Sequence, residues 1–101
     1  MTAYEEVEGV ALDVINLFVR KELKERYGAG LPYDRDTKMD DIGLNFYIRR
    51  NMAEETANRM QALCEEREKR WYGTGRGQVA ACVTIGAYVD LCSRQSQIFP
   101  S

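Results

Sequence analysis

The sequence predicts a small all-α protein, a bundle of three or four helices that forms a single helical domain over residues 1–101. Two long segments carry apolar residues at intervals of three and four, the spacing that lines one face of a helix. Runs of β-branched residues are few, and the chain contains only two prolines. Its 101 residues are enough for one domain with one hydrophobic core.

The first helix is predicted to run from just after Thr2 to about Gly28. Thr2 and Glu5 have the spacing of a capping box, in which each side chain binds a backbone N–H of the first turn. Gly28 matches a helix C-cap. The buried face of this helix is predicted to contain Val7, Val10, Ala11, Val14, Leu17 and Phe18.

Residues 28–39 contain glycine, proline and aspartate and are predicted to form a loop. A second helix is predicted from about Leu44 to Arg70. Asp40 and Asp41 are expected to cap its start and to interact favourably with the positive end of its dipole. Its buried face is predicted to contain Ile48, Met52, Ala53, Met60 and Leu63.

Three glycines within residues 73–77 predict that the second helix has ended before them. Periodicity does not assign residues 79–85 to helix or strand, and we expect a turn or a short helix there. A final helix should follow, capped by Thr84, with its tail fraying from Ser93 onward. Its buried face is predicted to contain Ile85, Tyr88, Val89 and Cys92.

The composition argues against several classes of protein. Histidine is absent, which removes the commonest general base and the commonest metal ligand. A net charge of −2 and a pI of about 5.2 lack the basic signature of nucleic-acid binding. We therefore expect a non-enzymatic protein without catalytic residues, metal site or cofactor, and without nucleic acid as its partner.

The cysteines and the hydropathy pattern bear on the compartment. Cys64, Cys82 and Cys92 are an odd number without close pairing, which favours free core thiols over disulfides. No segment stays apolar for the roughly 20 residues that a membrane-spanning helix needs. The acidic start lacks the layout of a signal peptide. A cytoplasmic protein without membrane contact is therefore expected.

The start of the second predicted helix contains the candidate partner-binding residues, Phe46, Tyr47, Arg49 and Arg50. Phe46 and Tyr47 are consecutive, so they diverge by about 100° on a helix and one core cannot easily hold both. Aromatic residues and arginine are enriched at protein interfaces. These four residues are predicted to form a contact surface. The alternative is that one ring lies in the core and the other covers a loop.

Two segments resemble the acyl carrier protein family. Asp-Ile-Gly-Leu at residues 41–44 is similar to the family's approach to its second helix, and residues 83–91 are similar to the start of its last helix. The family carries phosphopantetheine on a serine that follows the first motif. Here Asn45 and Phe46 stand where its aspartate and serine would be. The resemblance therefore implies a divergent carrier-like domain that lacks the attachment serine and its prosthetic group.

These observations favour a non-enzymatic helical binding or adaptor protein whose partner is another protein or a second copy of itself, as a homodimer. The first alternative is a helical bundle that binds a small apolar ligand beside Met52, Met60 and aromatic residues. The less favoured alternative is a nucleic-acid-associated regulator. That function would require five arginines to converge on one face, namely Arg49, Arg50, Arg59, Arg70 and Arg76.

Overall fold

The computed structural model describes residues 3–20, 22–23 and 34–96 of the chain. Four α-helices and one 3-10 helix are the named elements of these residues, and extended pairing among them is limited to two isolated bridges. The predicted fold class, a small all-α bundle, is confirmed. In chain order the elements are α1 (Ala3–Phe18), η1 (Met39–Ile42), α3 (Phe46–Glu66), α4 (Arg76–Ala80) and α5 (Ile85–Arg94).

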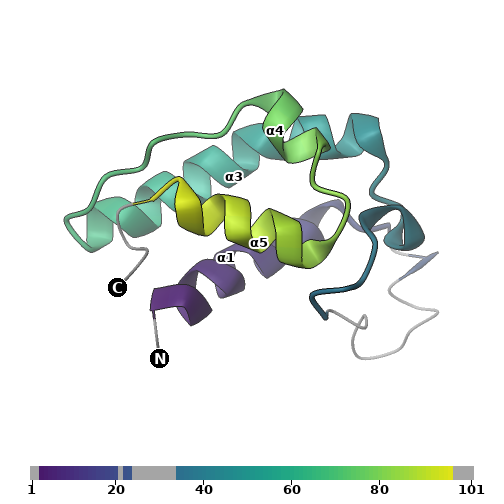
Figure 1. Cartoon of the computed structure of the whole chain (residues 1–101), viewed down its shortest axis with the longest axis horizontal. Coiled ribbons are helices and arrows are strands. Elements are labelled where there is room, and N and C mark those ends of the chain that lie inside the picture. Colours follow the sequence, from purple (N-terminus) through teal and green to yellow (C-terminus); the bar gives the residue numbers. More distant parts are fainter. Residues whose placement is uncertain (1–2, 21, 24–33, 97–101) are drawn as a thin grey trace.

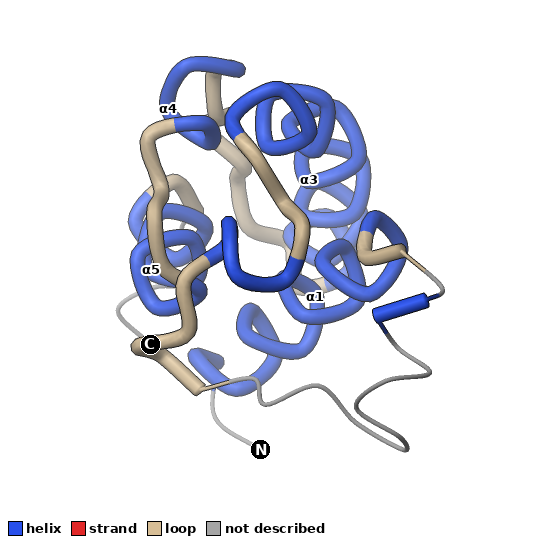
Figure 2. The backbone as a smooth tube through the Cα atoms, turned by 90° about the vertical axis from the view of Figure 1, so that its right-hand side faces the viewer, coloured by secondary structure: helices blue, strands red, loops and turns tan. Residues whose placement is uncertain are grey.

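The long helix α3 runs along the molecule, and α1 packs against both α3 and α5 (Figure 1). After α3 ends, residues 67–75 return along it and bring the short helix α4 against it. In the view of Figure 2, rotated by 90°, α1, α3, α4 and α5 surround a common interior. None of the described helices is both long and apolar enough to cross a membrane.

Helix α1 buries Val7, Ala11 and Val14 as predicted, but the exposure of Leu17 differs from the prediction. Leu17 is 57% exposed, whereas Ile15 is fully buried. At about 100° per residue these two positions lie on opposite edges of the apolar face, and the core lies on the side of Ile15. The helix ends at Phe18, so the prediction that it continues to about Gly28 is wrong. The predicted caps, Thr2 and Gly28, lie outside the described residues.

Helix α3 begins two residues later than predicted, and its cap is Asn45, whose Oδ1 accepts a 3.0 Å hydrogen bond from Ile48 N. The prediction that Asp40 and Asp41 cap this helix is wrong, because both belong to η1. The chain turns between the two elements at Gly43, whose φ of 80° suits glycine. Met52, Ala53 and Met60 are buried as predicted, and Ile48 and Leu63 are half-buried.

The same helix ends at Glu66, before the predicted Arg70. Glu68 adopts a φ of 58°, and Lys69 N donates a 2.7 Å hydrogen bond to Cys64 O. Glu68 N donates in turn to Glu65 O at 3.1 Å. These two bonds form a Schellman motif, which satisfies carbonyl groups at the helix end and reverses the chain.

The predicted short helix and final helix are both present. Residues 79–85 contain the end of α4 and the start of α5, and Thr84 caps α5 by accepting a 3.2 Å hydrogen bond from Ala87 N. The four residues predicted for the buried face of α5 are all buried. Ser93 to Ser96 are not a frayed tail, because Ser93 and Ser96 are buried and Gln95 O accepts a 2.7 Å hydrogen bond from Tyr72 N.

The core draws side chains from all of these helices. Tyr88 is fully buried, and its hydroxyl shares a 2.6 Å hydrogen bond with Thr56 Oγ1. The three cysteines are free and buried, as the sequence predicts. Burial raises the pKa of the Cys92 thiol to about 12 and raises that of the Tyr88 hydroxyl well above its usual value.

Residues 34–39 lie across the start of α5. Ile85 N donates to Thr37 O and Gly86 N donates to Arg35 O, each at 3.0 Å. These bonds satisfy N–H groups that have no acceptor inside the helix. The approach requires glycine at position 86, because a Cβ there would lie 2.9 Å from Arg35 O.

Gly86→Ala should lower the free energy of unfolding by about 1–3 kcal/mol, because the added methyl group forces the backbone at Arg35 to move. Gly9→Ala is the matched control in α1, since a Cβ at position 9 meets no atom within 4 Å. That control should stabilise the protein by about 0.5–1 kcal/mol through helix propensity. Urea unfolding followed by circular dichroism measures both, and equal effects would contradict the close approach at Gly86.

The buried thiol of Cys92 should make the protein less stable at alkaline pH. Its pKa rises from an ordinary 9.0 to about 12 in the folded chain, so the unfolded chain loses this proton first as pH increases. The protonated thiol therefore leaves the free energy of unfolding unaffected by pH below about pH 9. Between pH 9 and pH 12 this free energy falls, by up to about 1.4 kcal/mol per pH unit. Urea titrations should show a shallower alkaline loss for Cys92→Ala, and an unchanged slope would contradict the assignment.

Candidate functional site

Three of the four predicted partner-binding residues form an exposed surface on the first turns of α3. Phe46 is 49% exposed and Tyr47 is 72% exposed, and Arg50 is exposed as well. The ring centroids of Phe46 and Tyr47 lie 5.5 Å apart with an interplanar angle of 89°. The Arg50 guanidinium carbon lies 6.0 Å from the centroid of the Phe46 ring. We call these three residues the aromatic–arginine surface.

A hollow of about 250 Å³ adjoins this surface and is lined by Tyr47, Arg50, Asn51 and Arg76. The first three share one side of α3, because residues three and four positions apart are neighbours on a helix. Arg76 is the first residue of α4 and reaches the same hollow from a segment distant in sequence. We call this feature the arginine hollow. Asn51 and Arg76 are not among the residues predicted for this site, although the helical spacing from Tyr47 indicates Asn51.

Arg49 does not belong to the exposed surface, so the prediction that it contacts a partner is corrected. Only 6% of this residue is exposed, and its guanidinium is bound inside the protein. Nε donates to Ala80 O at 2.9 Å, and NH1 donates to Leu44 O at 2.9 Å and to Asp40 Oδ1 at 3.1 Å. Arg49 is in phase with Met52 on the buried side of α3, which is the sequence pattern that indicates its burial.

Arg49 belongs to α3, and its bonds join this helix to two other elements. Asp40 is in η1 and Ala80 is the last residue of α4, whereas Leu44 lies between η1 and α3. The carbonyl groups of Leu44 and Ala80 belong to buried residues and receive a charged donor. The carboxylate of Asp40 is 60% exposed, so its ion pair with Arg49 is the weakest of the three contacts.

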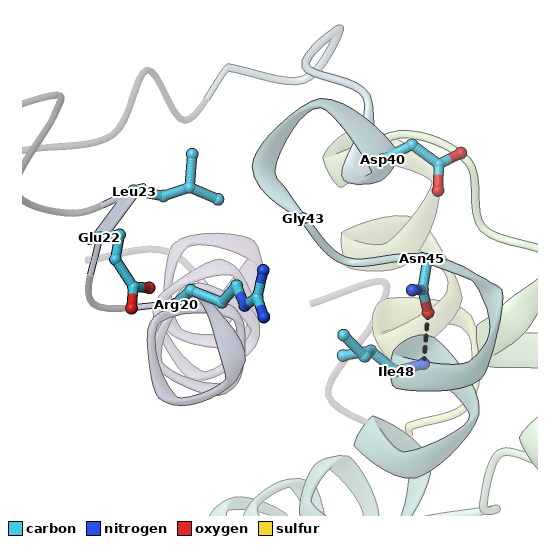
Figure 3. Close-up of a pocket in the computed structure, with 7 residues that line it drawn as sticks. All are labelled: Arg20, Glu22, Leu23, Asp40, Gly43, Asn45 and Ile48. Atoms are coloured by element: carbon cyan, nitrogen blue, oxygen red, sulfur yellow. Dashed lines mark hydrogen bonds between the residues drawn. The ribbon is translucent and has the colours of Figure 1, made fainter.

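A larger cavity of about 660 Å³ lies between residues that follow α1 and the junction of η1 with α3. Figure 3 shows Arg20, Glu22 and Leu23 on one side and Asp40, Gly43, Asn45 and Ile48 on the other. Most of the side chains that line it are charged or polar. Its composition differs from the apolar ligand site expected beside Met52 and Met60, which are fully buried members of the core.

A second polar cluster joins α1, the segment before η1 and α5. Arg35 donates to Asp90 Oδ2 at 2.6 Å and also donates to the Tyr4 hydroxyl, which in turn donates to Asp90 Oδ1 at 3.3 Å. The hydrogen bond from Arg35 lowers the pKa of Asp90, whereas burial raises the pKa of Tyr4. This arrangement holds residues 34–38 against α5. Within the described ranges, no three acidic or cysteine residues are placed to hold a metal ion.

The five arginines required by the nucleic-acid alternative do not form one free basic face. Arg49 is buried, and Arg59 forms an ion pair with Glu55 at 2.7 Å. Arg50 and Arg76 share the arginine hollow.

Comparisons with protein family models, with curated proteins and with solved structures find no match to this chain in any of the three.

Arg49→Met should lower the free energy of unfolding by about 2–4 kcal/mol, because two buried carbonyl groups lose their donor. Arg50→Met, next in the chain and exposed, is the matched control and should change stability by no more than about 0.5 kcal/mol. Urea unfolding at neutral pH compares the two variants. Equal losses would show that the bonds of Arg49 contribute little to stability.

Proposed function

We propose that this protein is a non-enzymatic helical binding or adaptor protein that docks on another protein through its aromatic–arginine surface. A second copy of the chain is the first candidate partner, which makes the protein a homodimer. The observation that carries the proposal is the exposure of Phe46 and Tyr47, two adjacent rings at the start of one helix. Such rings, next to arginine, are the residues that dominate binding energy at protein interfaces.

The size of the rings supports this role. An aromatic side chain has about 150–250 Å² of surface, and roughly half or more of each ring is in water here. Covering both would remove on the order of 200 Å² from water, worth about 5 kcal/mol before the cost of association. The stem of Arg50 adds apolar area, and its guanidinium remains available to a carboxylate.

The resemblance to acyl carrier proteins concerns the helical scaffold alone, because the attachment serine is missing. A carrier-like scaffold would place its attachment serine at the position of Phe46, the first residue of α3. In this chain the same position has an exposed ring, which favours a docking function over a prosthetic group. The proposed protein therefore uses no cofactor, and we place it in the cytoplasm.

Binding of a small molecule is the second candidate function, and the cavity of Figure 3 is the observation that favours it. Its volume of about 660 Å³ lies within the range of about 300–1,000 Å³ that is typical of ligand sites. Arg20, Glu22 and Asp40 line it, so the ligand would be polar instead of apolar. Exposed rings outside this cavity have no role in that function, which makes it the weaker candidate.

Replacing both rings, Phe46→Ala with Tyr47→Ala, should convert a homodimer into a monomer without unfolding it. Loss of an anchor of this type costs about 2 kcal/mol or more, or roughly thirtyfold in affinity. Sedimentation velocity measures the association state, and far-UV circular dichroism measures the helix content. The control is Tyr72→Ala, a ring that is 56% exposed but lies outside the surface, and it should leave the dimer intact.

A dimer that persists in the double variant would exclude this surface as the interface. A wild-type protein that sediments as a monomer at every concentration would exclude self-association. Loss of helix content in the double variant would show instead that the two rings support the fold.

A further inference from the structure

Two opposite charges one helical turn apart on α3, Arg50 and Glu54, are both exposed and do not pair with each other. Glu55 and Arg59 have the same spacing and form an ion pair at 2.7 Å. The order of the charges explains the difference, because helical side chains lean towards the N-terminus. Arg59 leans back to Glu55, whereas Arg50 leans back over the ring of Phe46.

Arg50, one of these two unpaired residues, lines the arginine hollow. Arg50 and Arg76 both line it, and neither forms an ion pair or hydrogen bond with another described residue. Asn51 contributes an amide and Tyr47 a ring. Two guanidinium groups without a carboxylate fit an acidic side chain of a partner. Glu54, one turn further along the same side of α3, is a carboxylate that pairs with none of the residues that the structure describes.

We infer that the arginine hollow receives Glu54 of a second copy, in a two-fold dimer whose α3 helices pair antiparallel. This inference rests on the proposed function and specifies its interface. In a two-fold pair, residues at equal distances on either side of the axis face each other. An axis at the level of Met52 places Arg50 of each copy opposite Glu54 of the other. The same arrangement lays Phe46 and Tyr47 of each copy against the middle of the other α3.

The two kinds of contact have different roles in this dimer. Burial of the rings supplies most of the affinity, because exposed ion pairs contribute little on their own. The charges fix the register and the antiparallel direction, since a parallel or shifted pairing would bring like charges together. Reversing one charge therefore weakens the dimer mainly by repulsion, and the repulsion should be relieved when the facing charge is reversed as well.

The test uses two single variants of the full chain, Arg50→Glu and Glu54→Arg. Each alone should dimerise at least tenfold more weakly than the wild type, because each facing pair becomes a like-charge pair. Mixed in equal amounts, the two should form a heterodimer with an affinity near that of the wild type, since every facing pair is again opposite in charge. Sedimentation velocity, with one variant carrying a fluorescent label, measures both results.

Glu65→Arg, in the last turn of α3, and Lys69→Glu, three residues after the helix ends, are the controls, because they make the same charge changes far from the proposed interface and should leave the dimer unchanged. Single variants that dimerise as the wild type does would overturn the inference, as would a mixture that fails to restore association. If those results occur while the ring variant becomes monomeric, the proposed function stands without this register. A monomeric wild type overturns the register and self-association together.

Discussion

The position of α4, and with it the shape of the arginine hollow, depends on the buried guanidinium of Arg49. Helix α4 has five residues and is too short to be stable without tertiary contacts. Its last residue, Ala80, is held to α3 by a charged donor, and the same side chain reaches Leu44 and Asp40 before α3. A single planar group with several fixed donors thus sets the positions of three elements, which a point charge such as lysine could not do.

Arg49 and Arg50 are neighbours in sequence but act in different environments. The step of about 100° between them turns one side chain into the protein and the other towards solvent. The two are nevertheless connected, because Arg49 fixes the end of α4 whose first residue, Arg76, completes the arginine hollow around Arg50. A buried polar contact therefore determines the geometry of an exposed charged one.

The helical fold and most of the buried faces could be predicted from the sequence because they follow from the spacing of apolar residues. The cap at Thr84 could be predicted because its hydroxyl directly precedes the apolar pattern of α5. The end of α3 could not be predicted, because Glu68 adopts the left-handed conformation in which glycine is usual, so no glycine marks the Schellman motif. The divergence of Phe46 and Tyr47 predicts that at least one ring is exposed, and in the structure both are. The phase of Arg49 with Met52 indicates that it faces inward, but its carbonyl acceptors at residues 44 and 80 are brought there by the tertiary fold and have no local sequence signal.

The outer side of α3 shows why the direction of a helix matters for what its charges can do. Side chains on a helix lean towards its N-terminus. A glutamate four residues before an arginine can therefore form an ion pair with it in the same helix, as Glu55 does with Arg59. Arg50 and Glu54 have the opposite order and do not pair with each other. The Arg50 guanidinium lies over the exposed ring of Phe46 instead. An antiparallel copy reverses the helix direction, and with it the order in which the charges meet. In the proposed dimer, the two charges that do not pair within one chain would therefore pair between two copies.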